Sequence, residues 1–442
     1  MNWLGWKSTV YTPLVGTPYG KSSFTNSWGQ NCPQSRRPEK QAEMKVLVYS
    51  HVFAPSVGGV ETYVMLLARG LSLSSCPRDG ERFEVTVATR TPAGAADDRS
   101  LPFRVVRRPR VIDLFRLLRA TDLVHLAGPS FLPLILGWLL RKPIVIEHHG
   151  YPACCPNGLL FYEPTQTVCP GHFMAGRYKE CLRCNAQAMG RLESTRVLML
   201  TFPRRWLSAQ AAANAPISRH VSERLRLPRS EVIYYGIPDQ AASDDVAAVH
   251  LSPAGTACFA YVGRLVSLKG LPLLLDAAKR LAAEGYIFRL KFIGDGLERG
   301  NLEELALSHG LKDRVEFTGS LRGEALRLAM EDVAAVVMPS IWEETAGLAA
   351  IEQMMRGRLV VAADIGGLGE IVDGGGLKFP PGDVAALAAC LKQVLEHPET
   401  TTALCAAARG RAQAVFGQQR MVDEHIRLYR RLATRPVRDD QS

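Results

Sequence analysis

The sequence has no apolar run long enough to cross a membrane. The longest run is residues 131–140 (FLPLILGWLL), which is too short to span a bilayer and contains Pro133. Residues 1–43 also lack the apolar core of a signal peptide and are rich in Ser, Thr, Pro, Gly and Gln. They predict a disordered N-terminal extension, or a start placed too early, with Met44 as the true first residue. We therefore expect a cytoplasmic protein. Residues 131–142 form either a core helix or a peripheral contact with the cytoplasmic face of a membrane.

Acidic residues are fewer than basic residues, and the sequence contains no nucleic-acid-binding motif. The chain has 53 Lys and Arg against 43 Asp and Glu, a net charge of +10, which suits an anionic partner such as a nucleotide or a membrane surface. Neither the zinc-finger spacing of DNA readers nor an RNA-stacking motif is present, so we expect no nucleic-acid partner. Residues 16–22 (GTPYGKS) imitate a phosphate-binding P-loop. They are one residue short between the glycines and follow no strand, so we reject that motif.

The length of 442 residues exceeds what one hydrophobic core usually supports, so we expect two domains. Short apolar runs alternate with helical patterns, which is typical of open parallel α/β sheets. The strands expected in the first half are 44–50, 84–89, 122–126, 143–149, 215–218 and 231–236. Those expected in the second half are 257–263, 288–294, 315–318, 333–337 and 359–362. The pattern predicts an N-terminal domain over 44–237, a linker over 238–256 and a C-terminal domain over 257–415. A C-terminal helix over 416–433 would pack back on the first domain.

The most informative stretch is residues 338–352 (MPSIWEETAGLAAIE), which follows an apolar strand and leads into a helix. Glu344 lies in the turn and Glu352 lies two turns along the helix, with seven residues between them. Gly347 leaves bare backbone N–H groups at the helix start, where a phosphate binds readily. The carboxylates could accept hydrogen bonds from two sets of hydroxyls, such as those of a sugar and a ribose. The alternative is a solvated helix face.

Other unusual groups also fall at the carboxyl ends of expected strands, which is where open α/β sheets bind ligands. Arg264 and Lys269 bring a planar fork and a point charge to one loop, a good pair for a diphosphate. Gly59 permits close approach of a ligand to the backbone, and His149 ends a strand. The alternatives are surface cations, a tight turn and a buried structural histidine.

Together these residues resemble the retaining, nucleotide-sugar-dependent glycosyltransferases of family 4 (glycosyl transferases group 1), over roughly residues 44–433. The motifs that carry the resemblance are the Gly-Gly loop (55–61), VGRL with a following KG (262–265, 269–270), IGDG (293–296), VEFTG (315–319), the Glu-x7-Glu element and GGLGE (366–370). The resemblance implies the GT-B fold, two Rossmann-like domains that face each other across a central cleft.

The resemblance also implies residue roles at the donor. Arg264 and Lys269 would hold the donor diphosphate, and Gly347 and Leu348 would offer backbone N–H groups to the phosphates. Glu352 would bind the ribose.

On the sugar side, the resemblance gives Glu344 the sugar hydroxyls, while Gly59 and His149 would close on the sugar from the N-terminal domain. Such enzymes transfer with retention, and the leaving diphosphate helps to take the acceptor's proton. They need no catalytic metal, in keeping with the absence here of a convincing Asp-x-Asp motif. Two departures are Ala346, where an aromatic residue is usual, and Tyr235, where Asn is frequent.

We accordingly expect a transferase that moves a sugar from a UDP-, GDP- or ADP-linked donor to a glycan, lipid-linked or small-molecule acceptor, in cell-surface polysaccharide or glycolipid biosynthesis. The alternatives are a phosphorylase-like enzyme of the same fold and a non-catalytic partner that binds a nucleotide-sugar.

Five of the ten cysteines fall within an insertion over residues 150–195 that interrupts the α/β rhythm. In a reducing compartment, clustered thiols favour a metal over disulfides. Cys155, Cys169, Cys181 and Cys184 include one C-x2-C pair and would satisfy tetrahedral zinc. Cys154 and His172 are rival ligands, and plain reduced thiols are the alternative to a structural zinc ion.

Overall fold

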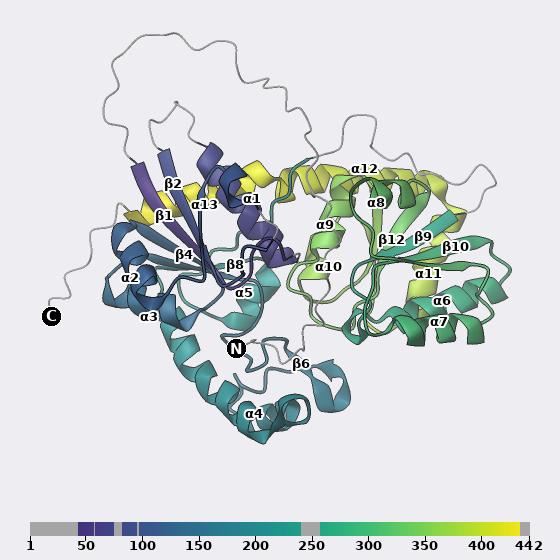
Figure 1. Ribbon diagram of the computed structural model, residues 1–442. Helices are drawn as coiled ribbons and strands as arrows, with labels where there is room; N and C mark the ends of the chain where they lie inside the picture. Colours follow the sequence, from purple (N-terminus) through teal and green to yellow (C-terminus); the bar gives the residue numbers. More distant parts are fainter. Residues whose placement is uncertain (1–42, 57, 75–81, 95–96, 240–256, 434–442) are drawn as a thin grey trace, which may run out of the picture.

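The computed structural model describes residues 43–56, 58–74, 82–94, 97–239 and 257–433. It contains two six-stranded parallel sheets with helices on both faces, joined side by side (Figure 1). The expected N-terminal extension, apart from Glu43, and most of the expected linker lie outside the described residues. No helix among the described residues is both long and apolar enough to cross a membrane.

The N-terminal sheet has the strand order β3-β2-β1-β4-β5-β8, with all pairs parallel. Its strands are β1 (Glu43–Ser50), β2 (Arg82–Thr89), β3 (Arg104–Arg107), β4 (Leu123–Ala127), β5 (Ile144–His148) and β8 (Ala213–Pro216). The order reverses between β1 and β4, and ligands bind beyond the strand ends at such a reversal. β3 has no counterpart in the sequence prediction, because its four residues RVVR form a short, half-exposed edge strand.

The C-terminal sheet repeats this topology in the order β11-β10-β9-β12-β13-β14. Its strands are β9 (Ala257–Val262), β10 (Phe288–Ile293), β11 (Val315–Gly319), β12 (Val333–Met338), β13 (Leu359–Ala363) and β14 (Leu377–Phe379). All six residues of β12 are buried, as expected for a central strand covered by helices on both faces. Here the order reverses between β9 and β12.

Helices cover both sheets. In the N-terminal half they are α1 (Gly59–Leu73), α2 (Val111–Ala120), α3 (Phe131–Leu139), α4 (Tyr178–Gln210) and α5 (Arg219–Leu225). In the C-terminal half they are α6 (Leu271–Ala283), α7 (Arg299–Ser308), α8 (Gly323–Ala329), α9 (Leu348–Met355), α10 (Gly366–Val372), α11 (Val384–Glu396), α12 (Pro398–Phe416) and α13 (Gln418–Ala433).

The insertion consists of turns, a small antiparallel hairpin and the first part of α4. The hairpin strands are β6 (Phe161–Tyr162) and β7 (Thr167–Val168). α4 breaks at Gly190, whose φ of 78° and ψ of 162° are not helical, so the element is two helices end to end. The second of these continues past the expected insertion and leads into β8.

The strand expected at 231–236 is wrong. Glu231 N donates to Asn214 O and Ile233 N donates to Pro216 O, but no ladder forms beyond a single bridge at Ser230. β8 ends at Pro216, which has no N–H to donate, so it cannot continue pairing with a further strand.

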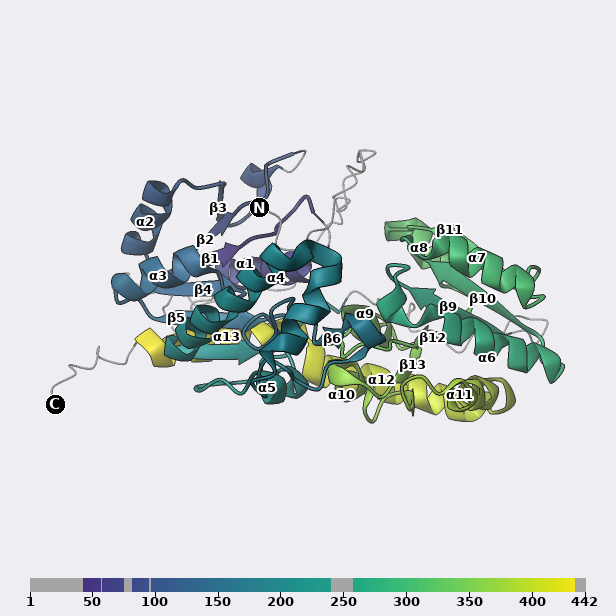
Figure 2. The ribbon, with the colours of Figure 1, turned by 90° about the horizontal axis from the view of Figure 1, so that it is seen from below.

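The C-terminal helices connect the two halves. α12 lies along the C-terminal domain and α13 continues onto the N-terminal domain, as Figures 1 and 2 both show. Gly417 marks the crossing: Ile237 N donates to Phe416 O and Gln418 N donates to Ile237 O, both at 2.9 Å. α13 buries six side chains at helical spacing, Met421, Val422, His425, Ile426, Leu428 and Tyr429. It therefore belongs to the packing of the N-terminal domain.

Candidate active site

A buried ion pair joins the loops that follow β9 and β12. Glu344 is 5% exposed, and its Oε1 lies 2.8 Å from Lys269 Nζ. Ser340 Oγ donates a hydrogen bond to the same oxygen. These partners fix the carboxylate at the point where the strand order of the C-terminal sheet reverses.

Backbone contacts hold the two loops together. Gly270 has a φ of +62°, and a Cβ added there would lie 2.1 Å from Pro339 O. Ile341 N donates to Leu268 O at 3.2 Å. A residue larger than glycine at position 270 would separate Lys269 from the loop that carries Glu344, so this glycine is required for the ion pair.

The start of α9 lies directly after this loop. Gly347 is its N-cap, with a φ of +110°, and an added Cβ would lie 2.9 Å from Leu368 Cδ1. The first N–H groups of a helix have no partner within the helix, so those of Leu348 and its neighbours are available to an anion. Glu352 lies one turn further on and is partly buried, and this burial raises its pKa while nearby Arg356 opposes the shift.

His149 follows β5 in the N-terminal domain, and its ring is oriented by Tyr235. His149 Nδ1 lies 2.7 Å from the Tyr235 hydroxyl, and the two rings stack with centroids 5.6 Å apart. His149 Nε2 is buried with no hydrogen-bond partner among the described residues. Burial lowers the pKa of His149 to about 4, so the ring is neutral at neutral pH. His148 faces away, with its Nε2 2.8 Å from Asn214 Oδ1, and is a structural residue.

Gly59 brings the two groups of residues together. A Cβ added to Gly59 would lie 4.0 Å from Leu348 Cδ2 and 4.0 Å from the Tyr235 hydroxyl. The glycine at the start of α1 therefore lies between the helix start of one domain and the His149–Tyr235 pair of the other. The predicted residues Gly59, His149, Gly347 and Leu348 thus share one region. Glu344 lies in the loop that precedes α9, and Lys269 reaches it from the loop after β9.

Arg264 is the exposed member of the predicted donor-binding residues. Its side chain is exposed and its guanidinium has no ion-pair partner among the residues that the structure describes. Its backbone is held, because the Tyr261 hydroxyl donates to Arg264 O at 2.8 Å. The exposed cation is free to meet an anion approaching this loop.

No sequence motif indicates the contacts between the two domains that hold residues 342–345 in place. Tyr151 OH donates to Glu343 O at 3.0 Å, and Ser218 Oγ donates to Thr345 O at 2.7 Å. Arg224 Nε lies 3.0 Å from the carboxylate of Glu343, whose side chain is 13% exposed. Glu343, not only Glu344, is therefore fixed by charge.

The insertion also reaches the candidate site. Trp342 Nε1 donates to the backbone oxygen of Leu159, which lies between Cys155 and the β6–β7 hairpin. The insertion thus contacts the loop that carries Glu344, and its packing affects the position of that loop.

The four cysteines proposed as zinc ligands lie in one buried region without forming disulfides. Cys155, Cys169, Cys181 and Cys184 are 5% to 7% exposed, and all are free thiols. Burial raises the pKa of the Cys155 thiol, and hydrogen bonds from the backbone N–H groups of Leu160, Gly158 and Asn157 oppose this shift. Burial raises the pKa of Cys181 to about 12 and that of Cys184 to about 11. Without a cation Cys181 and Cys184 therefore stay protonated at neutral pH.

The sulfur atoms are not at ligand distance in the structure. No three of these four thiols lie within 4.8 Å of one another among the described residues. Asn157 lies between two of them, 3.0 Å from Cys155 Sγ through Oδ1 and 3.8 Å from Cys184 Sγ through Nδ2. Zinc binding by this set remains a proposal that requires the Asn157 side chain to move.

Parts of the chain are similar in sequence to known glycosyltransferases. Residues 243–411 match the family described as glycosyl transferases group 1. In this region the chain is similar to the group 1 glycosyltransferases. Among the curated relatives, the 2-deoxystreptamine glucosyltransferase of Streptomyces kanamyceticus is 29% identical over 246 residues, which is 52% of this chain and 63% of that protein. The 2-deoxystreptamine N-acetyl-D-glucosaminyltransferase of Streptomyces fradiae is 29% identical over 366 residues, which is 75% of this chain and 81% of that protein.

Similar solved structures confirm the expected GT-B fold. Sucrose-phosphate synthase from Thermosynechococcus elongatus has a TM-score of 0.66 at 22% identity, covering 88% of this chain and 99% of that one. Anabaena HepE in complex with UDP and glucose has a TM-score of 0.63 at 18% identity, covering 88% and 100%. In sequence, the chain spans 63%, 45% and 42% of three curated relatives, the two Streptomyces kanamyceticus transferases and a mycobacterial glycogen synthase.

Proposed function

We propose that this protein is a retaining glycosyltransferase that uses a nucleotide-sugar donor. The observation that carries the proposal is the ion pair of Lys269 and Glu344, 2.8 Å apart, beside the start of α9 at the reversal of the C-terminal sheet. The complexes of HepE with UDP and with UDP-glucose support a donor of this kind. UDP-, GDP- and ADP-sugars are all candidates.

The donor diphosphate would lie against cations and helix N–H groups. Lys269 and Arg264 supply positive charge, and Gly347 and Leu348 supply the N–H groups. Such groups stabilise a leaving group whose charge grows in the transition state. In the proposed step the bond between the sugar anomeric carbon and the diphosphate oxygen breaks. The acceptor oxygen bonds to the same face of the sugar, and the acceptor's proton passes to the departing diphosphate.

The remaining side chains would orient the donor. Glu344 uses Oε1 for Lys269 and Ser340, which leaves Oε2 for a sugar hydroxyl. Neutral His149, with its free Nε2, would hydrogen-bond the sugar from the N-terminal domain. Glu352 would bind the ribose.

The acceptor is a hydroxyl of a glycan, a lipid-linked sugar or a small molecule. Cell-surface polysaccharide or glycolipid synthesis is the role that we expect. The names of the two 2-deoxystreptamine transferases support a small polyol as a further acceptor to assay.

The test is transfer of labelled sugar by purified wild-type protein, with the anomeric configuration of the product read by NMR. Glu344→Gln keeps the side-chain shape but removes the charge, so turnover should fall by at least about 100-fold, the range reported for loss of one charge-stabilising group in a site. Glu284→Gln is a matched control, because Glu284 pairs with Lys392 at 3.1 Å on the exposed surface of the same domain. Full activity of Glu344→Gln would refute the assignment. Phosphorolysis instead of transfer would favour the phosphorylase-like alternative, and nucleotide-sugar binding without turnover would favour the binding partner.

We also propose that α3 and α4 dock on an anionic membrane surface. Trp138 on α3 is 51% exposed, Trp206 on α4 is 54% exposed, and their rings meet edge to face with centroids 6.2 Å apart. Ile135 and Leu139 extend this exposed apolar face along α3. Exposed tryptophans are enriched at membrane interfaces because one ring combines apolar area with a polar N–H.

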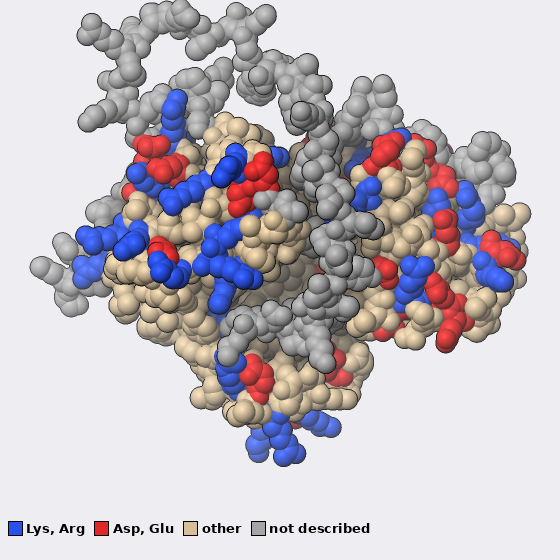
Figure 3. Space-filling view, in the orientation of Figure 1, with Lys and Arg blue, Asp and Glu red and all other residues tan. Residues whose placement is uncertain are grey.

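Charge favours a lipid surface over a neutral partner. Arg116, Arg119 and Arg141 are exposed on or next to α2 and α3. Lys and Arg predominate over the visible face of the N-terminal domain, whereas both signs mix over the C-terminal domain (Figure 3). Cosedimentation with vesicles that contain phosphatidylglycerol should occur at low salt and weaken with salt, because the attraction is screened.

A pair of substitutions tests the apolar part of this surface. Trp138→Ser with Trp206→Ser should abolish cosedimentation, whereas Leu307→Ser, at an equally exposed leucine of the C-terminal domain, should not. If wild-type protein does not cosediment with vesicles and is a dimer by light scattering, a second copy of the chain covers this face instead.

A further inference from the structure

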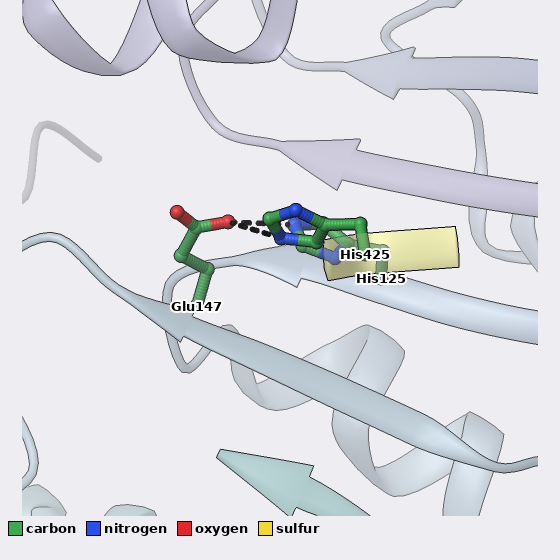
Figure 4. Close-up of side chains that lie close together, drawn as sticks. All are labelled: His125, Glu147 and His425. Atoms are coloured by element: carbon green, nitrogen blue, oxygen red, sulfur yellow. Dashed lines mark ion pairs between the residues drawn. The ribbon is translucent and has the colours of Figure 1, made fainter. Parts of the chain in front are cut away.

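Three fully buried side chains with metal-ligand chemistry converge between the N-terminal sheet and the C-terminal helix. They are His125 on β4, Glu147 on β5 and His425 on α13, each 0% exposed. Figure 4 shows both imidazole rings facing the same carboxylate oxygen. Their ligand atoms all lie within 4.8 Å of one another, and no other group of three His, Cys, Asp or Glu side chains in the described part of the chain meets that spacing.

The outer nitrogens of both rings are already committed. His425 Nδ1 lies 2.8 Å from Met421 O, and because a carbonyl only accepts, this nitrogen carries the proton. In the neutral ring His425 Nε2 is therefore a lone pair. His125 Nδ1 lies 2.9 Å from the Tyr429 hydroxyl. A second hydrogen bond of this kind is the usual way in which proteins orient a metal-binding histidine.

The carboxylate of Glu147 is close to both inner nitrogens without a hydrogen bond to either. Glu147 Oε2 lies 3.1 Å from His125 Nε2 and 3.6 Å from His425 Nε2. Nevertheless, neither oxygen of Glu147 nor His125 Nε2 has a hydrogen-bond partner of acceptable geometry among the described residues. The carboxylate oxygen and the two ring nitrogens are therefore close together, but their orientation does not suit direct hydrogen bonds. This arrangement is expected where all three atoms bind one atom that lies between them. Metal–ligand bonds of about 2.0–2.2 Å in a tetrahedron place neighbouring ligand atoms about 3.3 Å apart.

The charge of Glu147 also requires a partner. A buried carboxylate without compensation is costly, and the groups that face it are the two histidines, His149 and the Tyr63 hydroxyl, with no Lys or Arg among its described partners. Two neutral rings supply no positive charge. Either a proton on a histidine or a cation must supply it.

We propose that His125, Glu147 and His425 bind a divalent metal ion of the zinc class. Two imidazole nitrogens and one carboxylate oxygen are ligands that suit zinc. The Tyr63 hydroxyl on α1 donates a hydrogen bond to His425 Nε2 at 3.0 Å, and the metal–nitrogen bond would replace this hydrogen bond. The ion joins β4, β5 and α13, so its role is to fasten the C-terminal helix to the N-terminal domain rather than to take part in transfer.

Metal analysis of the full-length purified protein tests the proposal independently of any activity. We expect Glu147→Gln and His425→Asn each to lose one equivalent of metal per chain relative to wild type. His309→Asn is the matched control, because His309 Nε2 also faces a carboxylate, Asp276 Oδ1 at 2.8 Å, but on the C-terminal domain. It should retain the wild-type content. Equal metal content in all four proteins would overturn the proposal and leave a proton as the balancing charge.

A second measurement needs no variant and separates this site from the cysteines. X-ray absorption at the metal edge of the wild-type protein should show nitrogen and oxygen neighbours for at least one equivalent. Neighbours that are sulfur alone would place all bound metal on the thiols and overturn the proposal. Chelation should also lower the thermal unfolding midpoint of wild type and leave that of Glu147→Gln unchanged.

Discussion

Replacing Lys269 by Met should destabilise the fold through the carboxylate that it leaves behind. The side chains of Lys269 and Glu344 are only 16% and 6% exposed, so the pair lies close to the buried limit. Removing one partner of a buried pair costs ~3–5 kcal/mol, and exposed pairs contribute ~0–1 kcal/mol. The remaining exposure of the lysine permits some hydration of Glu344, so we expect a loss of about 2–3 kcal/mol in the free energy of unfolding.

The charge, rather than the packing, should account for most of this loss. Glu344→Gln removes the negative charge that Lys269→Met leaves unpaired. In a double-mutant cycle the two substitutions together should therefore cost less free energy of unfolding than the sum of the single variants, by at least about 1 kcal/mol, a typical coupling for contacting residues. The free energy of unfolding can be measured by urea denaturation with tryptophan fluorescence as the signal. Trp342 reports on this region, because the centroid of its ring lies 6.0 Å from Lys269 Nζ.

The exposed pair of Lys392 and Glu284, 3.1 Å apart, provides the control cycle and should show no measurable coupling. Equal coupling in both cycles, or none for Lys269 and Glu344, would refute the view that the donor-site carboxylate is held as a buried charge.

Three further predictions concern other parts of the site. Tyr235→Phe removes the hydroxyl that lies 2.7 Å from His149 Nδ1, so kcat should fall about 10-fold with little change in donor KM, less than the roughly 100-fold or more expected for a group that transfers a proton itself. Steady-state kinetics at several donor concentrations would show this, and a change in KM alone would contradict it. Gly294→Ala places a Cβ 1.8 Å from a backbone oxygen at a φ of +144°, so thermal unfolding should show a loss of more than about 3 kcal/mol, or no folded protein. A double variant with Cys181→Ser and Cys184→Ser should lose the sulfur-to-cobalt absorption band of cobalt-loaded protein if the thiols bind metal, and an identical spectrum would exclude these two ligands.

The sequence predicted those parts of the fold that depend on local pattern. A short, fully apolar run such as β12 is typical of a buried parallel strand. The glycine-bearing turns that follow such runs mark the carboxyl ends of the strands. Glu344 and Lys269 could be found because both lie next to such turns. The resemblance then supplied roles that spacing alone left open.

Other features depend on contacts that no local pattern encodes. Tyr429 and His125 are 304 positions apart, and Tyr63 and His425 are 362 apart, so the buried histidine cluster appears only when α13 packs on the first domain. The partner of His149 was noticed in the sequence only as a departure, Tyr235, and its hydrogen bond required the structure. Two other differences lie at the edges of the N-terminal sheet. β3 was missed because it is short, and residues 231–236 form no strand because the neighbouring strand ends at a proline.

Calorimetric titration with UDP-, GDP- and ADP-sugars tests the central claim most directly. The account predicts that wild-type protein binds at least one of them, that Lys269→Met binds it more than 10-fold more weakly, and that Lys392→Met binds it as wild type does. Equal affinity of the Lys269→Met variant, or no binding of any nucleotide-sugar to wild type, would contradict the claim that the loops after β9 and β12 form the donor site.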